Sequence, residues 1–241
     1  MDICDFAVGS YDEEHFRAVE LLEGADRGRV LDLPAGPGRL SWMLAQKGHG
    51  VVAGDIKPEI FKDPEIPIVK MNLQETFPFR DSSFDAAFLI EGPEHLENIY
   101  STFREYARIL KPGGRLILSL PNYSNLETRL KILFYGIAEP VTSAEELRNA
   151  SGNGRDLPHV NRPLYPLLRM ALDFAGFEIE RVESVNPKKK QWLLFPLFIL
   201  IKIFTIIKGK KGDMKYWIKD SNRKDILMGG NALMVKARIL K

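Results

Sequence analysis

The sequence predicts an α/β protein in which helices cover both faces of a mostly parallel, doubly wound β-sheet. Short apolar segments with the character of strands alternate with segments of about 10–15 residues whose apolar positions recur at helical spacing. One strand segment, RLILSLP, is apolar almost throughout, as expected for a parallel sheet that is buried on both faces. A glycine-rich turn, PAGPG, joins the first strand to the next helix. This alternation is typical of doubly wound sheets.

The individual elements are expected from local patterns. Strands are expected at residues 29–33, 50–55, 66–73, 83–91, 115–121, 177–184 and 231–240, and helices at residues 10–24, 38–48, 96–111, 122–136 and 164–176. Ser10 and Glu13 form a capping box at the start of the first helix. Pro112-Gly113-Gly114 ends the third helix, and Gly176 ends the last.

Length and composition indicate a single globular domain over residues 1–241. Hydrophobic residues make up 45% and charged residues 27%, which excludes a disordered or fibrous chain. The formal net charge of +2 gives no indication of a nucleic-acid partner. Cys4 is the only cysteine, so neither an intramolecular disulfide nor a cysteine metal cluster is expected. The first residues are acidic where a signal peptide would be basic and apolar, so we expect a cytoplasmic protein.

The turn after the first strand predicts a ligand of the nucleotide type. Glycines let the backbone approach a ligand closely, and a helix N-terminus offers unpaired N–H groups. Asp32, before the turn, suits an amino group, and Asp55, at the end of the second strand, can accept both hydroxyls of a ribose. A nicotinamide dehydrogenase is the alternative, but Ser41 stands where its GxGxxG pattern needs the third glycine. An amine and a ribose together describe S-adenosylmethionine.

Four segments together resemble a known family. They are VLDLPAGPGRL, the strand that ends at Asp55, VKMNLQETFPFRDSSFDAAFLIEGPEHLEN and EYARILKPGGRLILSLPN. In this order they are similar to class I S-adenosylmethionine-dependent methyltransferases of the methyltransferase-11/23 type, from about residue 29 to 122. A weaker likeness covers residues 177–184 and 232–239. The resemblance implies a Rossmann-like seven-stranded sheet, mostly parallel with an antiparallel last strand.

The resemblance also implies which residues bind the cofactor. They are Asp32, Pro34, Ala35, Gly36 and Gly38 in the loop, Asp55 at the ribose, Ile56, Asn72 and Leu73 at the adenine, and Glu91 near the methyl group. Two positions depart from the family's pattern. Asn72 replaces the usual aspartate, although an amide can still hydrogen-bond the adenine. Pro34 replaces the first glycine of the loop and so removes one backbone donor.

The stretch EGPEHLEN carries the candidate catalytic residues, Glu91 and His95. With Glu94 they form an E-x-x-E-H cluster that resembles the magnesium site of quinone O-methyltransferases and of small-RNA 2′-O-methyltransferases. A metal ion there would lower the pKa of a substrate hydroxyl. Without a metal, His95 either acts as a general base or only orients the next helix. We assign no metal to the site, and magnesium remains an alternative.

Five further residues are weaker candidates for the site. His159 lies within a lid-like substrate insertion at residues 122–162, where we expect a solvated histidine. Tyr11 is placed either to fold over the cofactor or to pack at the surface. His15 and His49 are expected at the surface, and Cys4 is expected to have no role.

A second insertion, at residues 186–211, is basic and apolar. Residues 188–211 contain seven lysines and no acid. The apolar run from Trp192 to Ile207 has 16 residues, fewer than the roughly 20 that span a bilayer. The segment therefore either packs on the protein's own core or a dimer interface, or contacts the inner face of a membrane peripherally.

These patterns predict an enzyme that methylates an oxygen of a small or lipid-linked acceptor. Catalysis would depend on the alignment of the acceptor with the sulfonium, while Glu91 or His95 assists deprotonation. The alternatives are an NAD-dependent oxidoreductase and a non-catalytic cofactor-binding protein that acts through its basic segment. The sequence leaves open the acceptor, its atom type and the oligomeric state.

Overall fold

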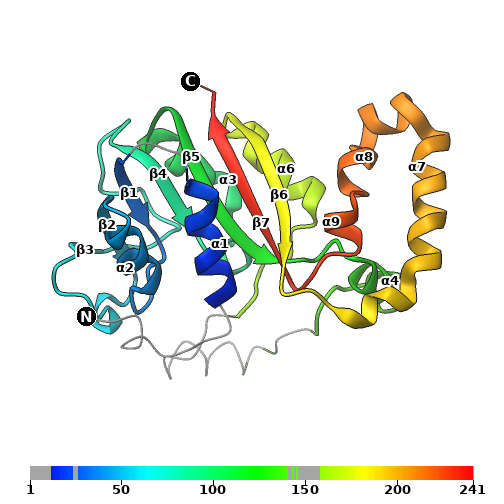
Figure 1. The fold of residues 1–241 in the computed structure, drawn as a ribbon, viewed down its shortest axis with the longest axis horizontal. Helices are drawn as coiled ribbons and strands as arrows, with labels where there is room; N and C mark the ends of the chain where they lie inside the picture. The colour runs from blue at the N-terminus through cyan, green and yellow to red at the C-terminus, as the bar shows by residue number, and fades with distance from the viewer. Residues whose placement is uncertain (1–11, 24–26, 141–142, 144, 146–157, 241) are drawn as a thin grey trace.

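The computed structural model describes residues 12–23, 27–140, 143, 145 and 158–240 (Figure 1). The predictions for Cys4, Ser10 and Tyr11 concern residues outside the described ranges. Within them, every strand and helix expected from the sequence is present.

A seven-stranded sheet forms the centre of the molecule, with the strand order β3-β2-β1-β4-β5-β7-β6. The strands are β1 (Arg29–Asp32), β2 (Gly50–Asp55), β3 (Ile68–Lys70), β4 (Phe84–Leu89), β5 (Leu110–Pro121), β6 (Phe177–Val185) and β7 (Ala232–Ile239). The pairs among β1 to β5 are parallel, whereas β7 runs antiparallel to both β5 and β6. The expected sheet, mostly parallel with an antiparallel last strand, is confirmed.

Helices cover both faces of this sheet (Figure 1). The helices are α1 (Asp12–Leu22), α2 (Arg39–Gln46), α3 (Ile99–Ile109), α4 (Leu126–Tyr135), α6 (Tyr165–Phe174), α7 (Phe195–Tyr216), α8 (Ile218–Ser221) and α9 (Lys224–Leu227), with short 3-10 turns η2 (Pro58–Ile60), η3 (Pro93–His95) and η4 (Lys189–Leu194). One buried cluster joins α1 and α2 to one face, and another joins α3 and α6 to the other. The two cores explain why the central strands are apolar on both sides.

The parallel strands bring their carboxyl ends to one edge of the sheet. Asp32 at the end of β1 pairs in register with Ala53 of β2 and Phe88 of β4. Asp55 ends β2, and Glu91 follows β4 by two residues. Residues that are far apart in the sequence therefore meet at this edge, which is where open α/β sheets bind their ligands.

The boundary between α3 and β5 differs from the expected one. The helix ends at Ile109 and the strand begins at once at Leu110, which pairs with Phe84 of β4. Pro112-Gly113-Gly114 therefore belongs to the strand and does not terminate the helix. The register shifts between Phe84 and Ala86, and Gly113 has a φ of 75°, so the glycine accommodates an irregular start of the strand.

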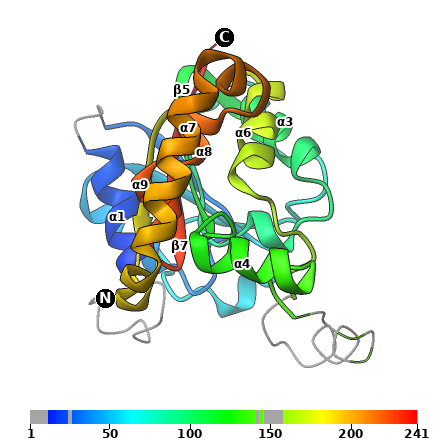
Figure 2. The same ribbon diagram turned by 90° about the vertical axis from the view of Figure 1, so that its right-hand side faces the viewer.

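Residues 188–227, which we call the arm, stand at the outer side of the sheet beyond β6 (Figures 1 and 2). They comprise Lys188, η4, α7, α8 and α9. Within the part of the chain that the structure describes, Lys189–Tyr216 is a helical stretch long and apolar enough, by length and composition, to cross a membrane. Only 11% of its apolar window is buried.

Candidate functional site

The glycine-rich loop leaves open space beside its backbone. Gly36 has a φ of 52°, and a Cβ built on it would meet no atom within 4 Å. Gly38, the residue before α2, has a φ of 95°, and a Cβ there would lie 2.5 Å from the ring of Phe61. Both positions therefore need glycine, because side chains rarely adopt this backbone conformation. The open side at Gly36 allows a ligand to approach the loop.

Asp32 lies beneath this loop. Its side chain is buried, and its Oδ2 accepts a hydrogen bond of 2.6 Å from the Ser41 hydroxyl in α2. Burial raises the pKa of Asp32 to about 7. The hydroxyl of Tyr106 donates to the carbonyl of Leu33 at 2.7 Å and so fixes the start of the loop. Asp32 thus holds the loop against α2. It is the residue that the sequence analysis expects near the amino group of the ligand.

Asp55 joins the loop to the end of β2. Its two carboxylate oxygens accept the backbone N–H groups of Gly36 and Lys57, each at 2.8 Å. A carboxylate offers about four lone-pair positions, so both oxygens keep capacity for a further donor such as a ribose hydroxyl. The neighbouring Ile56 leaves 47% of its surface exposed, which provides an apolar surface for a planar ring.

Asn72 and Leu73 lie beyond β3, which pairs with the end of β2 through Lys70 and Asp55. The Asn72 side chain accepts the backbone N–H of Gln74 at 3.0 Å. Its amide nitrogen donates to Glu75 at 3.3 Å, so the amide forms a turn. Leu73 packs partly against the main core. Asn72 and Leu73 therefore lie at the same carboxyl edge of the sheet as Asp55.

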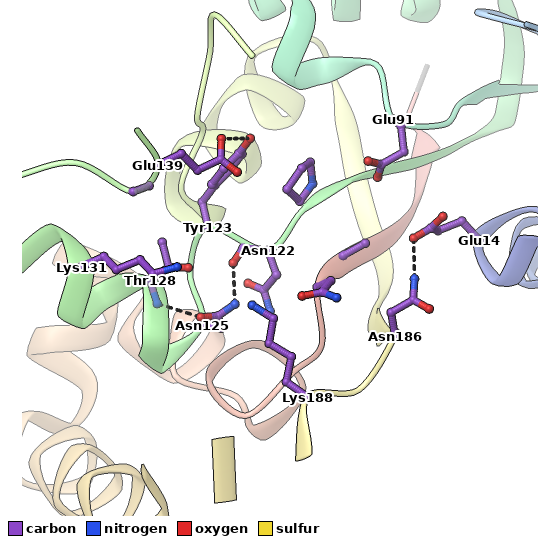
Figure 3. Close-up of a pocket in the computed structure, with 14 residues that line it drawn as sticks. Glu14, Glu91, Asn122, Tyr123, Asn125, Thr128, Lys131, Glu139, Asn186 and Lys188 are labelled. Carbon is purple, nitrogen blue, oxygen red and sulfur yellow. Dashed lines mark hydrogen bonds between the residues drawn. The ribbon is translucent and has the colours of Figure 1, made fainter. Parts of the chain in front are cut away.

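A cavity of about 430 Å³ lies next to this edge (Figure 3). Its described lining residues are Glu14, Glu91, Pro121, Asn122, Tyr123, Asn125, Thr128, Lys131, Ala138, Glu139, Asn186, Lys188, Asn231 and Ala232. In Figure 3, Glu91 and Glu14 face the cavity from one side, and Tyr123 and Glu139 from the other. The lining includes Glu91 but not the glycine loop or Asp55. Glu91 follows β4, the strand that pairs with β1 and so lies next to the strand that leads into the loop.

Glu91 and Glu94 form a buried acidic pair at the inner end of the cavity. The Glu91 N–H donates to Ser119 Oγ at 2.9 Å, and the Ser119 hydroxyl donates to Glu91 Oε1 at 3.1 Å. Glu94 is wholly buried, and neither of its carboxyl oxygens has a hydrogen-bond partner among the described residues. Burial and then the nearby charge of Glu91 raise the pKa of Glu94 to about 9, and burial also raises the pKa of Glu91.

Two histidines complete this cluster. Glu94, His95 and His159 offer ligand atoms that all lie within 4.8 Å of one another. The two imidazole rings have centroids 5.1 Å apart. His159 Nδ1 lies 3.1 Å from both the Tyr123 hydroxyl and a Glu139 carboxylate oxygen. The expectation that His159 is a solvated loop residue is therefore wrong, because the segment that follows Pro158 brings it against His95.

The two remaining histidines lie elsewhere. His49 is half-buried at the amino ends of the strands, where its Nδ1 lies 3.4 Å from the backbone nitrogen of Gly28. His15 is in α1, and its side chain is half-buried, with Nδ1 inaccessible to solvent. The expectation that both lie at the surface overstated their exposure. Neither residue lines the cavity.

The comparisons with known proteins agree on one family. Residues 31–118 match the family described as a methyltransferase domain. A solved structure of a SAM-dependent methyltransferase from Archaeoglobus fulgidus has the same fold, with a TM-score of 0.61 and 16% identity over 95% of each chain. Residues 31–118 therefore match a methyltransferase domain, and the fold is shared with an S-adenosylmethionine-dependent methyltransferase of known structure.

Two curated relatives are similar to this chain over part of their length. A ubiquinone biosynthesis O-methyltransferase from Xanthomonas oryzae pv. oryzae is 35% identical over 103 residues, which cover 39% of this chain and 43% of the relative. A demethylmenaquinone methyltransferase from Corynebacterium efficiens is 35% identical over 106 residues, covering 43% and 46%. The aligned part of the chain thus spans less than half the length of either relative.

The match to the family includes only part of the candidate site. Residues 31–118 include the glycine loop, Asp55, Asn72 and the cluster from Glu91 to His95. Tyr123, Glu139 and His159, which form the opposite wall, come after it. The glycine-loop edge therefore lies within the part of the chain that matches the family, whereas the opposite wall of the cavity lies outside it.

Proposed function

We propose that the protein transfers the methyl group of S-adenosylmethionine to an oxygen atom of a small or lipid-linked acceptor. The observation that carries this proposal is the position of Glu91, which lines the 430 Å³ cavity and follows β4, the neighbour of the strand that leads into the glycine loop. A group at this position can touch both a methyl donor on one side and an acceptor on the other. The family assignment makes S-adenosylmethionine the donor.

The cofactor would lie along the carboxyl edge of the sheet. Asp55 would accept the ribose hydroxyls, and Ile56 would pack on the adenine. Asn72 and Leu73 would line the far end, and the loop from Pro34 to Gly38 would follow the methionine part, near Asp32. The open space beside Gly36 supports this placement, because a close backbone approach is what the loop glycines permit.

Glu91 is the proposed acceptor of the substrate proton. It lines the cavity, whereas His95 does not, and its raised pKa brings it closer to the working pH. S-adenosylmethionine supplies the methyl group, whose bond to sulfur breaks as the bond to the acceptor oxygen forms. Glu91 takes the hydroxyl proton. His95 does not touch the acceptor and influences Glu91 only through its neighbours Glu94 and His159. Alignment of the two reactants supplies most of the acceleration.

The residues around Glu94 fit a divalent cation, and we include magnesium in the proposal. A wholly buried carboxyl group without a hydrogen-bond partner among the described residues is costly, unless a ligand completes its environment. Glu94, His95 and His159 would hold the ion, with Glu91 alongside. Bound there, the ion would lower the pKa of a coordinated hydroxyl group. Glu94 and Glu91 would supply the oxygen ligands that magnesium prefers, whereas His95 and His159 would add nitrogen ligands, which suit a transition metal better.

The acceptor class is inferred from the relatives and from the cavity. One relative is named a ubiquinone biosynthesis O-methyltransferase and the other a demethylmenaquinone methyltransferase, so both names refer to quinones. The cavity is too small for a nucleic-acid duplex, and its wall carries glutamates as well as lysines. We therefore propose a small-molecule acceptor and a cytoplasmic enzyme that contacts a membrane peripherally through residues 188–211. The NAD-dependent alternative is set aside, because the family is that of methyltransferases.

Isothermal titration tests the donor assignment. S-adenosylmethionine and its demethylated product should bind, and NAD should not. Mass spectrometry of copurifying small molecules, followed by a methyl-transfer screen, then identifies the acceptor. Binding of the donor without transfer to any hydroxyl-bearing acceptor would favour the second candidate, a non-catalytic cofactor-binding protein.

A further inference from the structure

The helix α7 has two different sides. Leu194, Phe198, Ile201 and Thr205, which recur at spacings of three or four residues, face the body of the protein. Phe198 packs with Leu126 and Leu227 in a small buried cluster. These inward-facing residues account for the apolar positions of the run that pack against the body of the protein.

The opposite side of α7 is apolar and exposed. Leu200, Ile203 and Ile207 recur at the same helical spacing on this side, and Ile207 leaves 75% of its surface exposed. Within the apolar run, Trp192, Leu193, Phe195, Ile199, Phe204 and Ile206 are also exposed, and Met214 and Tyr216 are exposed further along α7. A contiguous apolar surface of this kind on a folded protein indicates a binding face.

The charge around this surface indicates what binds it. The outward stripe itself carries no charged residue, whereas lysines flank the apolar run at both ends. Lys189 and Lys190 precede the apolar run from Trp192 to Ile207, and Lys210 and Lys211 follow it within α7, all four exposed. No acid occurs between Lys188 and Gly212. An apolar face bordered by lysines is complementary to a bilayer whose headgroups are anionic.

The arm is attached to the body along its length. Asn222 donates a hydrogen bond of 2.8 Å to Thr205 in α7. Arg129 of α4 donates to the Asn222 side chain and to the Ser221 carbonyl, both at 2.8 Å. Arg169 of α6 pairs with Asp220 at 2.5 Å. These contacts hold residues 220–222 of the arm, and through them Thr205 of α7, against the body, and a helix that crossed a bilayer would lose them.

The length of the apolar run agrees with a helix that lies on a membrane. The helical stretch Lys189–Tyr216 is long enough to cross a membrane, but its apolar run of 16 residues is about 24 Å long at 1.5 Å per residue, shorter than the bilayer core of about 30 Å. The backbone also breaks from helical geometry at Gly209, with φ 51° and ψ −145°. Figure 2 shows α7 lying across the face that is turned to the viewer, with α4 beside its lower end.

The start of the arm borders the cavity. Lys188, the first residue of the arm, lines the cavity together with Thr128 and Lys131 of α4. The end of α4 adds the exposed side chains of Leu133, Phe134 and Tyr135 to the apolar residues near the rim. A molecule resting in the membrane under α7 would therefore find the cavity entrance within reach.

We infer that the arm docks on an anionic membrane with the outward stripe of α7 among the lipids, and that the methyl acceptor enters the cavity from that membrane. The second part of this inference rests on the proposed methyltransferase activity. The occupant of the apolar face is a lipid surface, and the acceptor is a lipid whose head carries a hydroxyl group.

Vesicle sedimentation tests the docking. The full chain should bind vesicles of equimolar phosphatidylglycerol and phosphatidylcholine, and bind pure phosphatidylcholine far more weakly. Replacing Lys189, Lys190, Lys210 and Lys211 with Gln should reduce binding by at least about 100-fold, because each lysine contributes roughly fivefold. Ile203→Asp with Ile207→Asp should abolish binding without changing the melting temperature.

The controls separate docking from unfolding. Phe174→Asp introduces the same charge at an apolar residue of α6 that is equally exposed and lies away from the arm, and it should bind vesicles like the parent. S-adenosylmethionine binding, measured by titration, should be the same in all these variants. A parent protein that ignores anionic vesicles overturns the docking. So does a dimer in light scattering that Ile207→Asp converts to a monomer, since the face would then bind a second copy.

The acceptor is tested with labelled donor. With S-adenosylmethionine carrying a radioactive methyl group and a membrane lipid extract presented as vesicles, label should appear in the organic phase. The double aspartate variant should lose most of this label while binding the donor normally. Label confined to the aqueous phase overturns the membrane origin of the acceptor, whereas failure to bind the donor would refute the proposed function itself.

Discussion

The substitution Glu94→Gln isolates the buried carboxyl group of the candidate metal cluster. Glutamine has the same shape but cannot ionise. In the parent protein, burial and the charge of Glu91 raise the pKa of Glu94 from 4.5 to about 9. The unfolded chain ionises this group near pH 4.5, so the folded state is penalised progressively as the pH rises from there towards 9.

The size of this penalty follows from the shift. At pH 7 the group is about 2.5 pH units above its ordinary pKa, which corresponds to about 3 kcal/mol as an upper value, since Glu91 shares the environment. Without metal, Glu94→Gln should therefore equal the parent in stability near pH 4.5 and exceed it increasingly at higher pH. For a chain of this size, 3 kcal/mol is a rise in melting temperature of roughly 6–12 °C.

Magnesium should reverse this order. Binding of the ion requires the ionised carboxylate, so the parent's affinity should rise about tenfold per pH unit below pH 9. Glu94→Gln should lose the stabilisation by magnesium. Scanning calorimetry of both proteins between pH 5 and 8.5, with magnesium and with chelator, measures both effects. The exposed Glu97 gives a matched control, since Glu97→Gln should change neither. Equal stabilisation of parent and variant by magnesium refutes the metal site, and a pH-independent difference refutes the raised pKa.

Three further predictions concern the cofactor loop and the second histidine. Asp55→Ala should weaken S-adenosylmethionine binding in titration by about 1.5–3 kcal/mol, whereas Asp63→Ala, which removes a buried carboxylate with a similar turn bond, should not. Gly38→Ala should lower the melting temperature, at a cost of about 1–3 kcal/mol, because its Cβ would meet Phe61; an unchanged value would contradict the loop geometry. His159→Ala should weaken magnesium binding and leave donor binding intact, and equal magnesium affinity would remove it from the cluster.

The cofactor side of the site was predictable from the sequence, because its residues follow strands. A buried strand is recognisable locally, and in a parallel sheet all the carboxyl ends share one edge. Asp32, Asp55 and Glu91 could therefore be placed together before the structure was known. The hydrogen bond from Gly36 to Asp55 shows how directly that edge joins the loop.

The acceptor side was not predictable in the same way. His159 is 64 residues beyond His95, in a stretch without periodicity, and only the folded chain shows that their rings touch. The arm presents the opposite difficulty. Its sequence is apolar on every side, so no pattern showed that Phe198 faces the body and Ile207 faces outward. For this reason Phe198→Asp reports on the stability of the fold, and only the outward positions report on membrane contact.

The contact between the arm and the cavity rim leads to a last prediction. Lys188 Nζ lies 3.1 Å from Glu127 Oε2 in α4, and Lys131 lies 2.9 Å from the other oxygen of the same carboxylate. Both lysines line the cavity, so Glu127 ties the start of the arm to the rim. The ion pair between Lys188 and Glu127 is partly exposed and contributes at most about 1 kcal/mol to the free energy of local opening. Its loss should change the equilibrium constant for local opening about fivefold without unfolding the protein.

Hydrogen exchange measures this coupling. In Lys188→Gln, amide exchange should increase in η4 and in α4 and stay unchanged in the glycine loop. Lys189→Gln removes the neighbouring charge, which is exposed and does not line the cavity, and should leave exchange in α4 as in the parent. Exchange that is equal in the two variants would mean that the arm and the rim move independently. Membrane docking could then position the enzyme, but it would have no influence on the entrance through which the acceptor arrives.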